Sequence, residues 1–326
     1  MPRASIVVPA YNAAATLGAT LESLVRQTLG DFEVVVVDDG SSDATGALVR
    51  QLGDPRVRLV RQNNRGLAGA RNTGIAHARG AFIGFCDADD LWQPRKLAAH
   101  VAHLEANPQV GLSYAGSAFI DAAGRPTGHV QRPRLRGITA AHVFKRNPVG
   151  NGSAPVMRRA ALDAIAWRPA GETARDWWFD ESFRQSEDIE CWLRLALTTD
   201  WEIAGIPGAL TLYRLSAGGL SANTDAQLAS WERMVAKLSP LAPAFFDRHA
   251  PAARAYQLRY LSRRAISARD GARAAALALR GARQSLRPLW EEPSRTLVTW
   301  GAAAVLGLAG PERFATTEAR LLRRAA

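Results

Sequence analysis

The first ninety residues alternate between short apolar runs and amphipathic stretches, and this alternation limits the fold more than any other feature of the sequence. Runs of strand length that are rich in apolar residues occupy residues 5–8, 32–37, 57–60 and 81–86, with helical patterns at 16–29, 44–52 and 68–78 between them. Strand, loop and helix in this order predict an α/β fold with a mostly parallel, Rossmann-like sheet. The functional loops of such a sheet lie at the carboxyl ends of its strands.

Acidic side chains follow two of these strands directly. Asp38 and Asp39 end one strand, and Asp87, Asp89 and Asp90 end another with no basic residue among them. Three acids in four residues repel one another, and a divalent cation between carboxylates and a phosphate would relieve that repulsion. A simpler interpretation is a solvated turn, in which Asp90 helps to open a helix that Pro94 begins.

Arg71 lies between these acidic clusters, near the start of the helix at 68–78. Together with backbone N–H groups and a cation it could bind a diphosphate, while the carboxylates bind a base or ribose. The sequence contains neither G-x-G-x-x-G nor G-x-x-x-x-G-K-[ST], which counts against a dehydrogenase and a P-loop enzyme.

The middle of the chain predicts shorter elements and longer loops. Residues 110–120 form one or two strands, 124–137 a basic loop, 139–146 a helix and 155–157 a strand after the turn-rich segment 147–154. The loop 167–183 carries Trp177 and Trp178, and we expect an exposed, functional aromatic loop there.

An acidic pair opens a later helix, whose sequence is SEDIECWLRLAL. Ile189, Trp192, Leu193 and Ala196 share one face, and Glu187 and Asp188 lie in the first turn. The helix dipole alone would favour acids at these positions. A strand at 208–214 follows, and then a loop at 216–224 that could close over a ligand.

From Asp225 onward the pattern is helical. Two apolar faces predict a helical hairpin, one with Leu258, Leu261 and Ala265 and the other with Ala275, Leu279, Ala282 and Leu286. Residues 296–310 carry no charge, but this stretch is shorter than the ~20 residues of a spanning helix. We therefore expect a buried or interfacial helix there.

The net charge of +11 comes mostly from this tail. Residues 241–326 hold 15 arginines and 6 acids, a surplus of +9. Such a tail suits an anionic membrane surface, although the chain uses arginine in preference to lysine throughout, and no nucleic-acid-binding motif is present. The two cysteines, Cys86 and Cys191, form no metal or disulfide motif, and residues 1–12 do not have the pattern of a signal peptide. We expect a cytoplasmic protein.

Four motifs together resemble the inverting family-2 glycosyltransferases of the GT-A fold. They are SIVVPAYN, VVVVDDGSSDAT, NRGLAGARNTGIAHARGAFIGFCDADDLW and EDIECWLRLAL, within residues 4–215. The resemblance implies a GT-A domain at 1–225, with a nucleotide-binding half at about 1–115 and an acceptor half at about 116–225. A helical, arginine-rich region at 226–326 would follow.

The resemblance also implies a role for each matching residue. Asp188 would be the catalytic base, and Asp87 and Asp89 would be the metal ligands of a D-x-D motif. Glu187 and Trp192, with Gly152 and Ser153, would lie on the acceptor side. The donor nucleotide would contact Pro9, Ala10, Tyr11, Asp38, Asp39, Arg71, Asp87, Ala88 and Asp89.

The implied activity is sugar transfer from a nucleoside-diphosphate sugar, most simply a UDP-sugar, to a saccharide or lipid-linked saccharide, with Mn²⁺ or Mg²⁺. Such an enzyme would serve cell-envelope polysaccharide biosynthesis, with peripheral contact to the inner face of the plasma membrane through the C-terminal region. Two alternatives remain open: a sugar-nucleotide pyrophosphorylase, and a binding protein that keeps the fold without catalysis.

Overall fold

The computed structural model describes residues 1–215 and 224–325. The loop predicted at 216–224 lies outside these residues, apart from its last position. The chain divides into two compact units. The first unit comprises Met1–Val143 and Asn147–Ala217, and the second comprises Phe144–Arg146 and Gly218–Ala326. Whether the first unit has a nucleotide half and an acceptor half stays a prediction.

The strands of the first unit are β1 (Ala4–Ala10), β2 (Phe32–Asp38), β3 (Val57–Arg61), β4 (Phe82–Phe85), β5 (Leu91–Trp92), β6 (Val110–Ile120), β7 (Pro126–Gln131), β8 (Val156–Arg158) and β9 (Glu202–Arg214). Its helices are α1 (Leu17–Val25), α2 (Thr45–Gln51), α3 (Gly66–His77), α4 (Lys96–Ala106), α6 (Arg159–Asp163) and α7 (Glu187–Thr198). Helix α5 (Ala140–Arg146) spans the boundary between the units.

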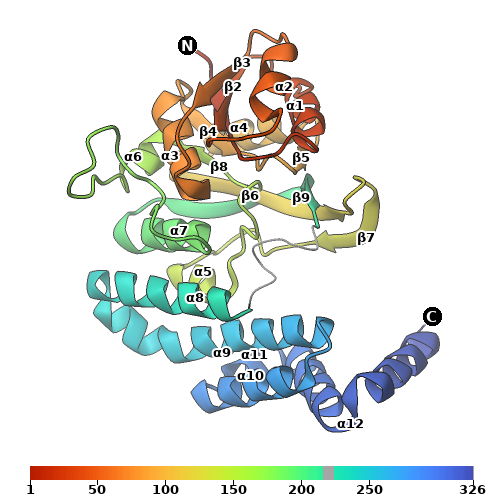
Figure 1. Cartoon of the computed structure of the whole chain (residues 1–326). Coiled ribbons are helices and arrows are strands. Elements are labelled where there is room, and N and C mark those ends of the chain that lie inside the picture. Colours follow the sequence, from red (N-terminus) through yellow and green to blue (C-terminus); the bar gives the residue numbers. More distant parts are fainter. Residues whose placement is uncertain (216–223, 326) are drawn as a thin grey trace. The chain divides into compact units, whose positions relative to one another are not determined.

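One mixed sheet organises the first unit (Figure 1), with nine strands in the described residues. The strand order is β3-β2-β1-β4-β8-β6-β9-β5, and β7 pairs with β6. Neighbours from β3 to β4 are parallel, as are β6 and β9, whereas β8, β5 and β7 join their neighbours in the antiparallel direction. The predicted α/β class is confirmed.

Helices cover both faces of the parallel part of the sheet. Ile6, Val8, Val34 and Val36 pack with residues of α1, α2 and α4 in one core cluster. On the other face, Val35 and Val37 pack against Ala70 of α3. Alternate residues of one strand therefore serve opposite faces, which explains the run of four valines at 34–37 in β2.

Two local predictions are wrong. The basic loop predicted at 124–137 contains β7, which pairs with β6 despite its exposed residues, because the backbone of β6 offers hydrogen bonds that the composition of the segment does not reveal. The helix predicted from Pro94 begins at Lys96, whose N–H bonds to the carbonyl of Gln93. Pro94 and Arg95 lie in the turn before it.

The second unit is helical, as predicted. It holds α8 (Thr224–Leu238), a 3₁₀ turn η2 (Ser239–Leu241), α9 (Pro243–Ser267), α10 (Gly271–Gln284), α11 (Arg287–Glu291) and α12 (Pro293–Ala325). Helices α9 and α10 form the expected hairpin (Figure 1), and Leu258, Leu261 and Ala265 are buried in it. No helix among the described residues has the length and apolar character needed to cross a membrane.

The predicted inner face of α10 is wrong. The buried residues are Ala274, Leu277, Ala278 and Gly281, whereas Leu279 is 55% exposed and Leu286, beyond the end of the helix, is 49% exposed. The helix is rich in alanine, and its small residues let α9 pack closely against it. The position of the leucines therefore does not decide which side of the helix is buried. Gly281 shows this, because a Cβ there would lie 3.3 Å from Cβ of Leu258.

Candidate active site

The ends of β1, β2 and β4 bring the first two acidic motifs to one edge of the sheet. Ala10 pairs with Asp38, and the N–H of Asp39 donates to the carbonyl of Ala10 (2.9 Å). The N–H of Cys86, just before Asp87, donates to the carbonyl of Val7 (3.0 Å). Pro9 and Ala10 are buried, and Tyr11 is 56% exposed at this edge.

Asp38 and Asp39 are both buried, and local groups occupy their carboxylates. Asp38 accepts from the backbone N–H of Ser41 (2.9 Å) and from Nε of Arg61 (3.1 Å). Asp39 accepts from the N–H groups of Arg65 (2.8 Å) and Gly66 (2.9 Å), where α3 begins. Asp39 therefore fixes the first turn of α3, whether or not it also contacts a nucleotide.

Asp90 anchors the turn that carries Asp87 and Asp89 through buried hydrogen bonds. Asp90 is 1% exposed and accepts from Oγ of Ser153 (2.6 Å) and from the backbone N–H of Arg214 (2.8 Å). The same Ser153 hydroxyl accepts from the N–H of Asp87 (2.9 Å), and Nε of Arg214 donates to the carbonyl of Asp89 (2.7 Å). Ser153 thus touches the D-x-D turn itself.

Asp90 and Arg214 are positioning residues that sequence reasoning did not identify. The run DADD and an arginine at the end of a strand were the available signals, but nothing in the sequence shows that the two meet across 124 positions. Ala88 takes part in the same support, since its carbonyl accepts from Oγ1 of Thr20 (2.9 Å).

Burial and mutual repulsion change the acidity of this turn. Burial, followed by the charge of Asp87, raises the pKa of Asp89 above its ordinary value. Burial raises the pKa of Asp90 further, with the charges of Asp87 and Asp89 adding to the effect. Both carboxyls therefore take up a proton more readily than an isolated aspartate, and a bound cation would favour their ionised forms.

Arg71 joins the D-x-D motif to the E-D motif. Its guanidinium donates through Nη2 to Asp87 (2.7 Å) and through Nη1 to Glu187 (2.8 Å). The side chain is 2% exposed and lies over the ring of Phe179. One buried cation thus holds together two acidic motifs that are 100 residues apart in the sequence.

Gly152 lies directly against this arginine. A Cβ at position 152 would come 2.1 Å from Nη2 of Arg71 and 3.3 Å from Oδ2 of Asp87. Only glycine leaves room for the guanidinium at this point. The predicted acceptor-side residues Gly152, Ser153 and Glu187 therefore all contact the cluster of Arg71 and Asp87 to Asp90.

Asp188 follows Glu187 in the first turn of α7. Its pKa is raised to about 7, first by burial and then by the charge of Glu187, while Arg71 acts in the opposite direction. Asp188 therefore exchanges a proton near neutral pH, which suits a general base. Trp192, one turn later, is 1% exposed and packs edge to face against Phe179.

The loop 167–183 is not the exposed aromatic loop that was predicted. Trp177 is half-buried, with its indole Nε1 donating to Glu172 (3.0 Å). Trp178 and Phe179 are 6% and 0% exposed. The side chain of Asn72 in α3 holds them, accepting from both of their backbone N–H groups (3.0 and 2.9 Å) and donating to the carbonyl of Phe179 (2.8 Å). The tertiary contact with α3, which the length of the loop does not reveal, is the reason for this burial.

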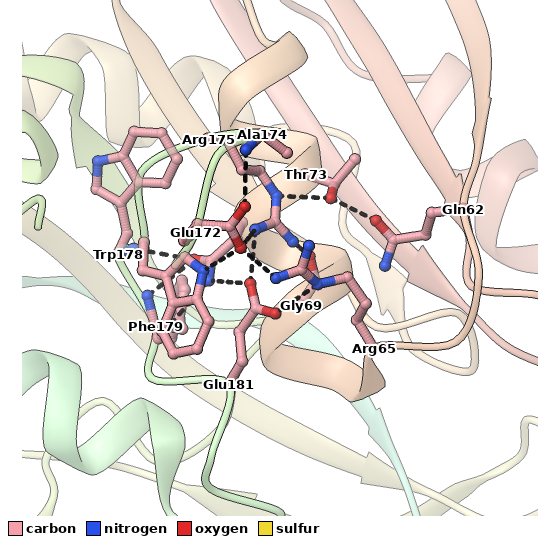
Figure 2. Close-up of polar contacts among 12 residues, drawn as sticks. Gln62, Arg65, Gly69, Thr73, Glu172, Ala174, Arg175, Trp178, Phe179 and Glu181 are labelled. Atoms are coloured by element: carbon pink, nitrogen blue, oxygen red, sulfur yellow. Dashed lines mark hydrogen bonds and ion pairs between the residues drawn. The ribbon is translucent and has the colours of Figure 1, made fainter. Parts of the chain in front are cut away.

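A set of charged and polar side chains, which we call the α3 polar network, extends this contact (Figure 2). Arg175 donates to Oγ1 of Thr73 (2.9 Å) and to the carbonyl of Gly69 (2.9 Å), and it pairs with Glu181 (2.7 Å). Glu181 also accepts from Nε of Arg65 (2.7 Å). The members of the network are Gln62, Arg65, Thr73, Glu172, Arg175 and Glu181.

The network closes on Asp39. The hydroxyl of Thr73 donates to Gln62, whose Nε2 donates to Asp39 (2.6 Å), and Asp39 also accepts from the N–H of Arg65. Figure 2 shows Arg65 and Arg175 converging on Glu172 and Glu181. The loop, α3 and the end of β2 are thus one hydrogen-bonded assembly, which the sequence reasoning missed.

The donor set at the D-x-D turn fits a hard divalent cation. Asp87 and Asp89 offer carboxylate oxygens, the ligands that Mg²⁺ and Mn²⁺ prefer, and Arg71 already balances Asp87 on one side. No group of three His, Cys, Asp or Glu side chains in the described part of the chain is arranged to hold a metal ion. Two carboxylates leave coordination positions that phosphate oxygens can fill.

Comparison with known proteins identifies the family. Residues 5–166 match the profile of Glycosyl transferase family 2. The chain is 35% identical to an Escherichia coli protein, "UDP-Glc:alpha-D-GlcNAc-diphosphoundecaprenol beta-1,3-glucosyltransferase WfaP", over 70% of this chain and 83% of that protein. The chain belongs to glycosyltransferase family 2, and the resemblance drawn from the motifs is confirmed.

Two further similarities bear on function and fold. "Succinoglycan biosynthesis protein ExoO" of Rhizobium meliloti (strain 1021) is 33% identical over 68% of this chain, which spans only 63% of that protein. A solved structure, "Mannosyltransferase PcManGT from Pyrobaculum calidifontis in complex with GDP-Man and Mn2+", has a TM-score of 0.56 at 24% identity. It covers 94% of this chain and 87% of its own, and it supports the fold alone.

Proposed function

We propose that this chain is an inverting, metal-dependent hexosyltransferase of cell-envelope polysaccharide biosynthesis. It moves a sugar from a UDP-sugar to a hydroxyl of a saccharide or lipid-linked saccharide. The names of WfaP and ExoO support a UDP-linked donor, a lipid-linked acceptor and polysaccharide synthesis. The observation that carries the proposal is the bridge of Arg71, which sets the D-x-D turn against the helix end that bears Asp188.

The donor side is the edge formed by β1, β2 and β4. Pro9, Ala10 and Tyr11 would contact the base, with Asp39, Asp38 and Arg71 on the base or ribose. Asp87 and Asp89, with Ala88 between them, would hold Mn²⁺ or Mg²⁺ on the diphosphate, and Asp89 is the more direct ligand. The bound ion would act as a Lewis acid that offsets the charge of the leaving diphosphate.

The acceptor side is the loop of Gly152 and Ser153 together with the start of α7. Asp188 would remove the proton of the acceptor hydroxyl as its oxygen bonds to the anomeric carbon and the bond to the diphosphate breaks. One attack with one base inverts the anomeric configuration. Glu187 would act through Arg71, and Trp192 through the packing of α7.

The decisive experiment is a panel of nucleotide sugars with Mn²⁺, scored for release of nucleoside diphosphate in the presence of saccharide acceptors. Asp188→Asn should keep donor binding and abolish transfer, and Asp89→Ala should lose metal-dependent donor binding. Asp163→Asn, an exposed acid on α6, is the matched control and should behave as wild type. A fully active Asp188→Asn variant would remove the base assignment.

The same assay separates the two alternatives. Formation of a sugar nucleotide from a sugar phosphate and a nucleoside triphosphate would favour a pyrophosphorylase. Nucleotide-sugar binding without transfer to any acceptor would favour a non-catalytic protein. Membership of the glycosyltransferase family supports transfer over both.

We also propose a cytoplasmic position at the inner face of the plasma membrane. The arginine surplus of residues 241–326 supports it, because basic segments are attracted to anionic lipid headgroups.

A further inference from the structure

The first part of α12 has two different sides. Thr296, Thr299, Ala303 and Leu306 are buried, with exposed fractions of 0–4%. Leu297, Val298, Val305 and Leu308 are 57%, 71%, 38% and 91% exposed. At about 100° per residue these four fall in one sector of the helix. We call them the α12 apolar face.

Exposure of the α12 apolar face to water is energetically unfavourable. A helix on the surface of a globular protein normally carries charged or polar residues on its outer side. From Thr296 to Pro311 the sequence has no charged residue. Over these residues the outer side of α12 therefore presents no charged side chain to the solvent. A contiguous exposed apolar patch of this kind indicates an interaction surface.

The two acids that precede the α12 apolar face in the chain are already paired within the second unit. Glu291 accepts from Lys145 (2.8 Å) and from the hydroxyl of Tyr256 (2.7 Å). Glu292 pairs with Arg146 and Arg259. The two negative charges that directly precede the face in the chain are therefore neutralised.

Exposed arginines precede and border the α12 apolar face in the chain. Arg280, Arg283 and Arg287 are exposed on α10 and α11, and none of them has an ion pair among the residues described. Arg295 is 71% exposed, with its nearest acid, Glu292, 3.8 Å away. Trp290, between these arginines in the sequence, is 77% exposed. The segment thus combines apolar and cationic side chains.

We propose that the α12 apolar face, with Trp290, docks on an anionic phospholipid bilayer. The apolar side chains enter the boundary between headgroups and acyl chains, and Arg283, Arg287 and Arg295 meet the lipid phosphates. A second copy of this chain suits the face less well, because it would bring like-charged arginines together. The docking rests on the proposed function in one respect: the proposed lipid-linked acceptor is located in the bilayer.

The test is co-sedimentation of the full chain with vesicles of phosphatidylglycerol and phosphatidylcholine, compared with phosphatidylcholine alone. The wild type should bind the anionic vesicles, and binding should weaken at high salt. The double variant Leu297→Glu with Leu308→Glu should lower the partition constant by about tenfold or more. Leu241→Glu, at a position 55% exposed on η2, is the matched control and should bind as wild type.

Three outcomes would overturn the proposal. The wild type fails to bind anionic vesicles, or the double variant binds as well as Leu241→Glu does. The third is a dimer in sedimentation equilibrium that Leu308→Glu dissociates, which would assign the face to a second copy. Circular dichroism shows whether the variants fold, and transfer to a water-soluble saccharide should be the same in all of them. A failure of docking is therefore distinguishable from a failure of the proposed function.

Discussion

Arginine is used in opposite ways at the candidate active site of the first unit and on the exposed segment before α12 in the second, although the second unit also holds a buried arginine, Arg259, paired with Glu292. In the first unit Arg71, Arg175 and Arg194 are at most 9% exposed, and each is paired with acidic side chains. In the second unit Arg283 and Arg287 are exposed. The net charge of a unit therefore does not indicate how important its arginines are for structure. The first unit has the smaller surplus of positive charge, but its buried arginines hold the candidate active site together.

The energetics of the two uses differ as well. Removing one partner of a buried ion pair leaves an uncompensated charge, which costs about 3–5 kcal/mol. Exposed pairs contribute about 0–1 kcal/mol, because water and salt screen them. Substitutions of the buried pairs at the site should therefore have larger effects than substitutions of the partly exposed pairs in the second unit.

The largest effect is expected for Arg71→Leu. Asp87 and Glu187 would lose their shared cation, and the free energy of unfolding should fall by about 3–5 kcal/mol. Sugar transfer should become undetectable, because the two acidic motifs would repel each other. Urea denaturation and the transfer assay measure the two effects. Arg71→Lys should unfold at an intermediate urea concentration, and substantial activity in Arg71→Leu would contradict the bridging role.

The next effect concerns the pH dependence of transfer. Asp188 acts as a base only when deprotonated, and its pKa is about 7. The value of kcat/KM should therefore fall about tenfold for each pH unit below 7, while donor binding changes less. Because a lysine at position 71 keeps the positive charge that lowers the pKa of Asp188, Arg71→Lys should leave this acid limb near pH 7. A pH profile that is flat from 5 to 8 would exclude Asp188 as the base.

A smaller effect is expected at the α3 polar network. Glu181→Gln removes the charge shared by Arg65 and Arg175, which loosens the loop from α3 and from Asp39. The donor KM should rise by about tenfold, the equivalent of ~1.4 kcal/mol, with kcat nearly unchanged. Asp176→Asn is the control, because Asp176 lies on the same loop in an exposed pair with Arg168. A fall in kcat with an unchanged donor KM would show that the network does not position the donor.

The sequence allowed prediction of the elements that depend on local pattern. The strands β1, β2 and β4 are largely apolar runs and the helices α1 and α7 are amphipathic, and acids lie at or directly after the ends of β2 and β4. Contacts between distant segments were not predictable. Nothing local shows that Arg71 meets both Asp87 and Glu187, or that Asn72 buries Trp178.

The α10 helix shows the limit of periodicity. Two neighbouring stripes of this helix consist mainly of alanine and leucine, and the stripe with Leu279 was predicted to be buried. The choice between them depends on how closely a neighbouring helix can approach, which is a property of the packing and not of the helix. The same limit applies to α12, where the sequence alone left burial and an interfacial position as alternatives.

The smallest effect is expected for Arg254→Gln in the second unit. This substitution tests whether a partly exposed ion pair contributes less to stability than the buried pairs of the first unit. Arg254 forms two hydrogen bonds to Glu232 (2.7 and 2.8 Å), and both side chains are about a quarter to a third exposed. Loss of this pair should cost at most ~1 kcal/mol and lower Tm by about 2–4 °C, with transfer unchanged. Differential scanning calorimetry measures the shift. A destabilisation as large as that of Arg71→Leu would mean that partly exposed pairs hold the helical unit together as firmly as buried pairs hold the site.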